Sequence, residues 1–181
     1  MGGSEVKEML LALVSNKVAD YLEIRVEEST ISSLRFRGPV LEAVNSSMQH
    51  GGCIRALVNG GWGFITFNDL NNLEEKVARA IHQAQLVGAA GGDGRLAPVP
   101  VVQDVVQVPF LEDPRQVKLA DKVELFRGYN EIVLSHGKQI VSSSINYFDK
   151  YSKIHFANSE GTYILQHKLD LAGGVTAIAS D

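Results

Sequence analysis

Residues 51–64 decide the fold, and they read Gly-Gly-Cys-Ile-Arg-Ala-Leu-Val-Asn-Gly-Gly-Trp-Gly-Phe. The stretch Asn59-Gly60-Gly61 is typical of a tight β-hairpin, because such a turn needs positive φ angles, which Asn and Gly adopt at little cost. Strands are expected on both sides of it, at Gly52–Val58 and Trp62–Phe67. The hairpin therefore predicts that this part of the chain forms an antiparallel sheet.

The pattern of strands extends upstream of the hairpin. In Tyr21–Glu27, apolar and charged residues alternate, as they do in a half-buried strand. Leu34–Arg37 alternates in the same way and ends at the turn Gly38-Pro39, and Val40–Ser47 follows as a third strand. Residues 21–67 are thus predicted to form an antiparallel meander of about five strands.

Three other segments have apolar residues at three- and four-residue steps, which is typical of an amphipathic helix. They are residues 4–18, 72–87 and 117–135. At the start of the second segment, Asn72 and Glu75 are expected to form a capping box. Asp113-Pro114 is expected to cap the third segment, with proline at the first helical position.

Strands are predicted again after the third helix. They are Gln139–Tyr147, Tyr151–Ala157, Thr162–Lys168 and Gly174–Ala179. A helix followed by a meander thus occurs twice, and the segment Leu34-Arg35-Phe36 resembles Ile154-His155-Phe156. The predicted class is α+β, with helices packed on antiparallel strand meanders and an internal duplication of the helix–meander unit.

This order predicts two sub-domains along the chain. Residues 1–87 contain a helix, the five-strand meander and the second helix. Residues 88–116 form an extended, Pro- and Gly-containing linker in which Val99–Val108 adds an edge strand. Residues 117–181 form the second helix–meander unit, which is expected to be incomplete at its C-terminal end.

Composition narrows the class of function. The net charge is −4 and no basic cluster occurs, so the sequence predicts no nucleic-acid partner. No apolar run approaches the roughly 18 residues that span a bilayer, so no membrane partner is predicted. A single cysteine, Cys53, excludes an internal disulfide and fits a reducing compartment, and we expect a cytoplasmic protein.

The sequence offers no catalytic and no metal-binding residue. A metallopeptidase needs closely spaced histidines, and no two of the five histidines lie within five residues of each other. His155 and His167 fall on neighbouring predicted strands and are interpreted as exposed positions, and Cys53 is interpreted as a small buried apolar residue. The candidates for a binding surface are Trp62 and Phe64, which could stack on a ligand or pack across the hairpin.

These residues resemble a known family. The pattern Tyr21-x-Glu23-Ile24-Arg25-x-Glu27, followed by Gly51–Phe64, is similar to the first domain of TldD/PmbA proteins, although Gly51-Gly52-Cys53 replaces the family's Gly-x-Gly. In the second half, the resemblance rests on Lys122-Val123-Glu124-Leu125 and on the turn Asn158–Thr162. The resemblance is closer to TldD than to PmbA.

The resemblance implies a cytoplasmic, dimeric zinc metallopeptidase that acts on peptides or unfolded proteins. It implies zinc for the full-length protein, on a His-Glu-x-x-x-His helix that has no counterpart here, so this chain is expected to hold no cofactor and to be inactive alone. Its partners are expected to be a peptide or unfolded protein and a homo- or hetero-oligomer with a family member. The alternative is a stand-alone protein-binding regulatory module of the gyrase-modulator type, which a coding region continuing past Asp181 into such a helix would exclude.

Overall fold

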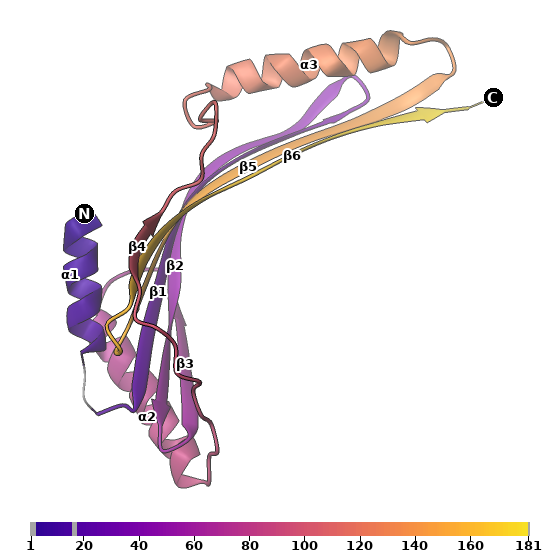
Figure 1. The fold of residues 1–181 in the computed structure, drawn as a ribbon. Coiled ribbons are helices and arrows are strands. Elements are labelled where there is room, and N and C mark those ends of the chain that lie inside the picture. The colour runs from indigo at the N-terminus through magenta and orange to yellow at the C-terminus, as the bar shows by residue number, and fades with distance from the viewer. Residues whose placement is uncertain (1–2, 16–17, 181) are drawn as a thin grey trace. The chain divides into compact units, whose positions relative to one another are not determined.

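The structure is a computed structural model that describes residues 3–15 and 18–180. Figure 1 shows the elements in chain order, and their order confirms the predicted α+β class. They are α1 (Gly3–Val14), β1 (Tyr21–Arg37), β2 (Val40–Val58), β3 (Gly61–Phe67), α2 (Leu73–Ala89), β4 (Gln103–Val106), α3 (Leu119–Ser135), β5 (Ile140–Asn158) and β6 (Tyr163–Ala179). The strands form one six-stranded sheet in the order β3-β2-β1-β5-β6-β4.

The structure has fewer and longer strands than the sequence predicted. Residues 21–67 form three strands and not five, because β1 and β2 each continue through the polar stretches where breaks were expected. In β1, the buried hydroxyl of Ser29 lies 3.2 Å from that of Ser152 on β5, so polar side chains find partners inside the sheet. Pairing in the sheet therefore overrides the low strand propensity of these stretches. For the same reason, the four strands expected after α3 are two, β5 and β6.

The sheet is mixed and not purely antiparallel. The hairpin pairs β2 with β3 antiparallel, in the register Arg55↔Phe64. At the other end of the strand order, β4 pairs with β6 in parallel, in the register Gln103↔Tyr163. The predicted edge strand in the linker is thus confirmed, although it covers only four residues.

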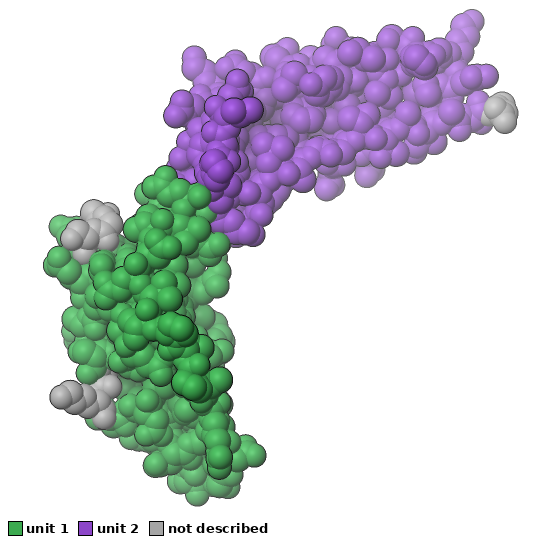
Figure 2. Space-filling model, viewed as in Figure 1, with its two compact units in different colours: residues 1–28, 50–107, 153–167 green, residues 29–49, 108–152, 168–181 purple. Residues whose placement is uncertain are grey.

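The chain divides into two compact units, which Figure 2 shows in green and purple. Unit 1 contains residues 1–28, 50–107 and 153–167, and unit 2 contains residues 29–49, 108–152 and 168–181. Each unit collects segments from distant parts of the sequence, and β1, β2, β5 and β6 contribute to both. The division in chain order into 1–87, 88–116 and 117–181 stays a prediction, as does the internal duplication.

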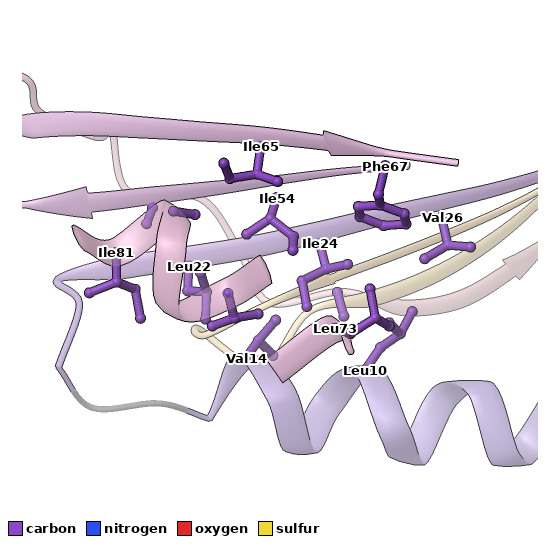
Figure 3. Packing of buried hydrophobic residues seen from close by; sticks show 14 of the residues in the cluster. Leu10, Val14, Leu22, Ile24, Val26, Ile54, Ile65, Phe67, Leu73 and Ile81 are labelled. Carbon is purple, nitrogen blue, oxygen red and sulfur yellow. The ribbon is translucent and has the colours of Figure 1, made fainter. Parts of the chain in front are cut away.

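Unit 1 has an extensive apolar core. Side chains from α1 and α2, including Leu10, Leu73 and Ile81, pack against side chains of β1, β2 and β3 such as Ile24 and Ile54 (Figure 3). Each fully buried aliphatic side chain contributes about 1.5–3 kcal/mol relative to exposure. This layer of α1 and α2 on the sheet therefore dominates the stability of the unit.

The turn of the hairpin has the predicted geometry. Asn59 and Gly60 have φ angles of 48° and 78°, so both central residues are left-handed. Beyond the turn, β3 lies directly against α2, because a Cβ added to Gly61 would be 2.1 Å from the backbone nitrogen of Gly88. Glycine at position 61 is thus required by the close approach of the helix.

The predicted helix caps are wrong. Asn72 precedes α2 in a left-handed conformation with φ 52°, and its side chain forms no capping hydrogen bond. Lys118, and not Asp113-Pro114, precedes the first residue of α3. The Asp113 carboxylate instead accepts a hydrogen bond of 3.0 Å from the backbone N–H of Arg115, so the turn at 113–115 uses the group that was expected to cap the helix.

Unit 2 holds α3 on its sheet with polar contacts. The apolar cluster beneath the helix is small and is centred on Leu34, Phe36, Ile145 and Tyr147. The buried residues of α3 are Lys122 and Asn130. The Lys122 ammonium lies 2.6 Å from the Asp149 carboxylate. The Asn130 side chain donates to the carbonyl of Gly38 at 2.7 Å and accepts from the Ser143 hydroxyl at 2.6 Å.

In the part of the chain that the structure describes, no helix is both long and apolar enough to cross a membrane.

Candidate functional site

Both predicted binding residues lie on the face of β3 that α2 does not cover. Along β3, Gly61, Gly63, Ile65 and Phe67 are buried, whereas Trp62 and Phe64 alternate with them. A Cβ on Gly63 would lie 2.0 Å from the Ala80 carbonyl oxygen of α2, so the buried row faces this helix. Because successive residues of a strand point to opposite faces, Trp62 and Phe64 point away from α2.

Trp62 is held by its neighbours in unit 1. The Arg55 guanidinium lies 4.8 Å from the centre of the indole, and the Tyr21 ring meets it edge-on at 6.2 Å. The linker passes close to the indole at Gly94, whose N–H donates to the Gly60 carbonyl at 2.8 Å. Trp62 is thus half-buried among protein groups, whereas Phe64 stays 53% exposed and is free to meet a ligand.

A network of polar side chains joins Trp62 on this face. The Arg55 guanidinium contacts one Glu23 carboxylate oxygen at 2.9 Å, and the Tyr21 hydroxyl donates to the other at 2.6 Å. Burial, followed by the hydrogen bond to Glu23, raises the pKa of Tyr21 to about 12. Tyr21 therefore stays protonated and is a stable hydrogen-bond donor to the Glu23 carboxylate. The network suits binding and orientation more than acid–base chemistry.

These three network residues were not singled out as site residues from the sequence. Arg55 lies opposite Phe64 in the β2–β3 register, so the hairpin alone would have placed it beside the two aromatic candidates. The contact of Arg55 with Glu23 joins β2 to β1, and its existence depends on the strand order. A single sequence does not give that order, which explains why the network was missed.

Cys53 is less buried than predicted. It is a free cysteine with intermediate exposure. Burial, and next the charge of Glu23, raise the pKa of the Cys53 thiol, while Arg25 and Arg55 oppose this. A raised pKa keeps the thiol protonated, which is the unreactive form. The residue therefore shows no sign of being a nucleophile.

The interpretation of His155 as an exposed residue is wrong. His155 is buried, and its Nδ1 atom lies 2.9 Å from the hydroxyl oxygen of Tyr163. Burial lowers its pKa, so the imidazole is neutral near pH 7. His167 is only partly buried. Among residues 3–15 and 18–180, no three His, Cys, Asp or Glu side chains come together in a group that could hold a metal ion.

A groove in unit 1 lies between α1 and the start of α2. It measures about 650 Å³ and is lined mainly by apolar side chains, namely Met9, Leu13, Leu70, Leu73 and Val77. A specific small-molecule site combines such walls with a few converging polar groups. Among the residues that the structure describes, the polar side chains of this lining are those of Ser15, Asn72 and Glu74. The groove therefore defines no particular ligand.

The strand order leaves parts of several strands without an outer neighbour. In unit 1, β3 and β4 are the outermost strands. The pairing of β3 with β2 begins at Gly52, in unit 1. Among the described residues of unit 2, residues 40–49 of β2 therefore have an open edge. Likewise β4 pairs with β6 only up to Gln166, so residues 168–179 of β6 have an open edge. Such edges can accept another strand.

The fold defines the class of protein, an α+β module, and the comparisons define its family. Residues 22–84 match the family model described as PmbA/TldA metallopeptidase domain 1. Residues 112–181 match the model described as PmbA/TldA metallopeptidase central domain. The chain belongs to the PmbA/TldD family, whose members are of the metallopeptidase type.

Curated relatives agree with this assignment. A metalloprotease of Synechocystis sp. is 34% identical over 164 residues, which are 90% of this chain and 35% of the relative. A metalloprotease of Methanothermobacter thermautotrophicus is 31% identical over 162 residues, with the same two shares of 90% and 35%. The chain thus spans about a third of the length of the curated relatives it matches.

Solved structures share the fold. TldE from Thermococcus kodakarensis has a TM-score of 0.70 at 17% identity, over 97% of this chain and 39% of that one. A protein of Bacteroides thetaiotaomicron, named as a candidate modulator of DNA gyrase, has a TM-score of 0.70 at 16% identity, over 98% of this chain and 41% of that one. At these identities the likeness concerns the fold alone.

Proposed function

We propose that this chain is a non-catalytic, substrate-admitting and assembly module of a PmbA/TldD-type metallopeptidase that acts on peptides or unfolded proteins. Family membership supports the reaction class. The share of about 35% of the relatives' length leaves room for the catalytic part elsewhere in a longer protein. Among residues 3–15 and 18–180 no three His, Cys, Asp or Glu side chains gather in a group that could hold a metal ion, which supports a task other than metal-dependent catalysis.

The observation that carries the proposal is the set of open strand edges. An extended peptide can join such an edge as an additional strand, and the main-chain hydrogen bonds then supply affinity with little dependence on sequence. That mode of binding suits an enzyme that acts on unfolded chains. The peptide gains few hydrogen bonds, and the entropy cost of ordering it offsets part of their free energy. The affinity is therefore expected to be on the order of micromolar.

Zinc, the oligomer and the cell compartment are parts of the same proposal. Zinc would be held by the longer protein outside these 181 residues, and that protein would form a homo- or hetero-oligomer with a family member. The absence of a basic cluster in the sequence and the single cysteine support a cytoplasmic protein that acts on proteins and not on nucleic acid.

The alternative function is a stand-alone protein-binding regulatory module without an enzymatic role. It is favoured by the names of two similar solved structures, from Thermotoga maritima and Bacteroides thetaiotaomicron, as candidate modulators of DNA gyrase. A direct titration of purified gyrase against this chain separates the two functions. Saturable binding of gyrase, together with no binding of unfolded peptides, would favour the regulatory module.

The main experiment titrates the 181-residue chain with extended peptides in which alternate backbone amides are N-methylated. Methylation removes a main-chain donor and leaves the side chains unchanged, so affinity should fall in an alternating pattern along the peptide. Affinity that is unaffected at every position would mean that the peptide is not added as a strand. Elemental analysis of chain purified without chelator should find no stoichiometric zinc, and about one tightly held zinc per chain would contradict the proposed division of labour.

A further inference from the structure

One strand edge in unit 2 lacks the features that normally protect an edge. Residues 168–179 of β6 have no outer strand among the described residues. From Leu171 to Ala179 the edge contains no charged residue and no proline. Soluble proteins usually place lysine, proline or a bulge on such an edge, because a long uncharged edge is a template for another strand. This edge is therefore suited to binding.

An apolar stripe on α3 lies above the same edge. Leu125, Tyr129 and Ile132 follow the three- and four-residue spacing of one helix flank, and they are 53%, 45% and 64% exposed. At about 100° per residue, Arg127 lies on the opposite flank of the helix. The Arg127 guanidinium lies 5.5 Å from the Phe36 ring on β1. In the strand order β1-β5-β6, the apolar stripe must therefore lie on the β6 side.

The upper face of β6 completes this surface. A Cβ on Gly173 would lie 3.8 Å from the Phe126 ring of α3, whereas a Cβ on Gly174 would meet nothing within 4 Å. Because strand residues alternate between faces, Leu171 and Val175 share the helix-facing side with Gly173. Both side chains are exposed, at 60% and 52%. The α3 stripe and this face of β6 therefore belong to one surface, here called the ledge, with the helix as its wall and the strand as its floor.

We propose that this ledge, formed by Leu125, Tyr129, Ile132, Leu171 and Val175 beside the β6 edge, binds an extended, uncharged peptide with apolar side chains at every second position. The inference rests on the proposed function and names the edge and the peptide that it accepts. The row of peptide side chains that faces α3 packs on the ledge, and the other row faces the open side of the sheet. Specificity is thus confined to alternate residues.

Charge favours an uncharged occupant. A charged side chain on the helix-facing row would be desolvated without a partner, because the ledge itself contains only apolar side chains and the Tyr129 hydroxyl. The edge at residues 40–49 of β2 differs, since Glu42 lies there within 4.0 Å of Arg35 and 3.7 Å of Arg37. An apolar segment therefore gains more at β6 than at β2.

The size of the ledge favours a peptide over a second copy of this chain. Nine residues at about 3.3 Å each make a ledge about 30 Å long, and we take its width as about 10 Å, the spacing between packed layers. Each partner would then bury about 300 Å², or roughly 600 Å² in total. Stable protein–protein interfaces bury about 1,200–2,000 Å². The strand of a second copy would also present Gly173, Gly174 and alanines, which supply few side chains to fill the ledge. A peptide with large apolar residues fills it better.

The test uses two variants of the same strand that are matched in exposure. Val175→Lys places a charge on the ledge, and Ile178→Lys places one on the opposite face, where the side chain is also 52% exposed. The probe is a fluorescent nine-residue peptide that alternates Leu and Ser, with a peptide of equal composition in Leu-Leu-Ser-Ser order as control. Val175→Lys should weaken binding of the alternating peptide about tenfold or more, corresponding to about 1.4 kcal/mol. Ile178→Lys should change it less than about threefold, and the control peptide should bind the unmodified chain more weakly.

A second pair of variants tests the wall of the ledge. Ile132→Asn should weaken binding of the alternating peptide, whereas Glu131→Asn on the outer face of α3 should not. Unfolding midpoints of all variants show whether the fold is kept. Equal losses for Val175→Lys and Ile178→Lys would overturn the ledge while leaving edge binding in place, whereas no binding of any peptide to the unmodified chain would overturn the proposed function as well. A monomer produced from a dimer by Val175→Lys, without a change in peptide binding, would assign the edge to a second copy and overturn the inference.

Discussion

Both units place helices against the sheet, but they do so with different chemistry. In unit 1, α1 and α2 share with the strands a cluster that includes eighteen buried apolar residues among those described. In unit 2, the corresponding cluster beneath α3 has four, and the buried residues of the helix are Lys122 and Asn130. Apolar burial is non-directional, whereas an ion pair and an amide need a particular partner. Unit 1 is thus built for stability, and unit 2 fixes the position of one helix.

The buried ion pair of unit 2 offers the strongest test of this difference between the units. Lys122→Met should destabilise the chain by about 3–5 kcal/mol, because Asp149 is 1% exposed and would keep an uncompensated charge. Urea unfolding measures this loss. The double variant Lys122→Met with Asp149→Leu should recover most of it, since two apolar groups need no partner. A single variant that loses less than about 1 kcal/mol would show that the pair does not hold α3.

The second prediction concerns the close approach of β3 and α2 in unit 1. Gly61→Val should cost about 3 kcal/mol, because a Cβ there would lie 2.1 Å from the Gly88 nitrogen and 2.4 Å from the Ala84 oxygen, both backbone atoms of α2. Gly174→Val, in open space on β6, is the matched control and should stay within about 0.5 kcal/mol. Thermal unfolding of the two variants compares them, and equal midpoints would argue against a helix packed on β3.

A variant in the linker, Gly92→Val, gives a second comparison with Gly61→Val. From the sequence, residues 88–116 are an extended linker, in which Gly92→Val is expected to destabilise the fold less than Gly61→Val. The structure places a Cβ of Gly92 at 2.5 Å from the Gly60 carbonyl oxygen, so this variant should also destabilise unit 1. Its loss should be smaller than that of Gly61→Val, since the linker can move away from the hairpin and a helix in the core cannot.

A smaller effect is expected at the amide anchor of α3. Asn130→Ala removes the donor to the Gly38 carbonyl and the acceptor of the Ser143 hydroxyl, which are both buried. The loss should be about 1–2 kcal/mol in urea unfolding, because a buried group without its hydrogen bond keeps its desolvation cost. The same substitution at exposed Asn45 serves as control. If the two variants unfold alike, the amide does not fix the helix.

The smallest effect concerns the network of unit 1 at high pH. The pKa of Tyr21 is raised to about 12, above the value near 10 of an unfolded tyrosine. Folding therefore favours the protonated hydroxyl, so its stabilisation is present below about pH 10 and is lost as the pH rises toward 12. Tyr21→Phe should be slightly less stable than the unmodified chain near pH 8 and equal to it near pH 11.5. An unchanged difference at both pH values, measured by urea unfolding, would contradict the raised pKa.

Local signals in the sequence predicted the elements well. The Asn59-Gly60 turn and the apolar spacing of α2 come from neighbouring residues, and both appear where they were expected. Features that depend on distant residues were missed. The polar middle of β1 becomes a strand only because β5 pairs beside it, and Ser29 then meets Ser152. His155 is buried because Tyr163, across the β5–β6 turn, packs against it.

The surfaces show the same limit. Trp62 and Phe64 were singled out from the hairpin, but the partners Glu23 and Tyr21 come from another strand. The ledge of unit 2 was not foreseen, because it joins a helix flank to a strand about 40–50 residues away in sequence. Its one local signal is the run from Leu171 to Ala179, which contains no charged residue. An edge strand protected against pairing usually contains a charged residue or a proline.

The shared strands have a consequence for the way the chain folds. Unit 1 needs residues 153–167, and unit 2 needs residues 29–49 together with 168–181. During synthesis, unit 1 therefore cannot close until residues 153–167 have left the ribosome, and residues 29–49 must wait for residues 168–181, which are made more than 100 residues later. Topologies with so many non-local pairings fold slowly, and their unpaired strands stay exposed in the meantime. This nascent chain is thus expected to depend on holding chaperones for longer than a chain whose units are contiguous in sequence.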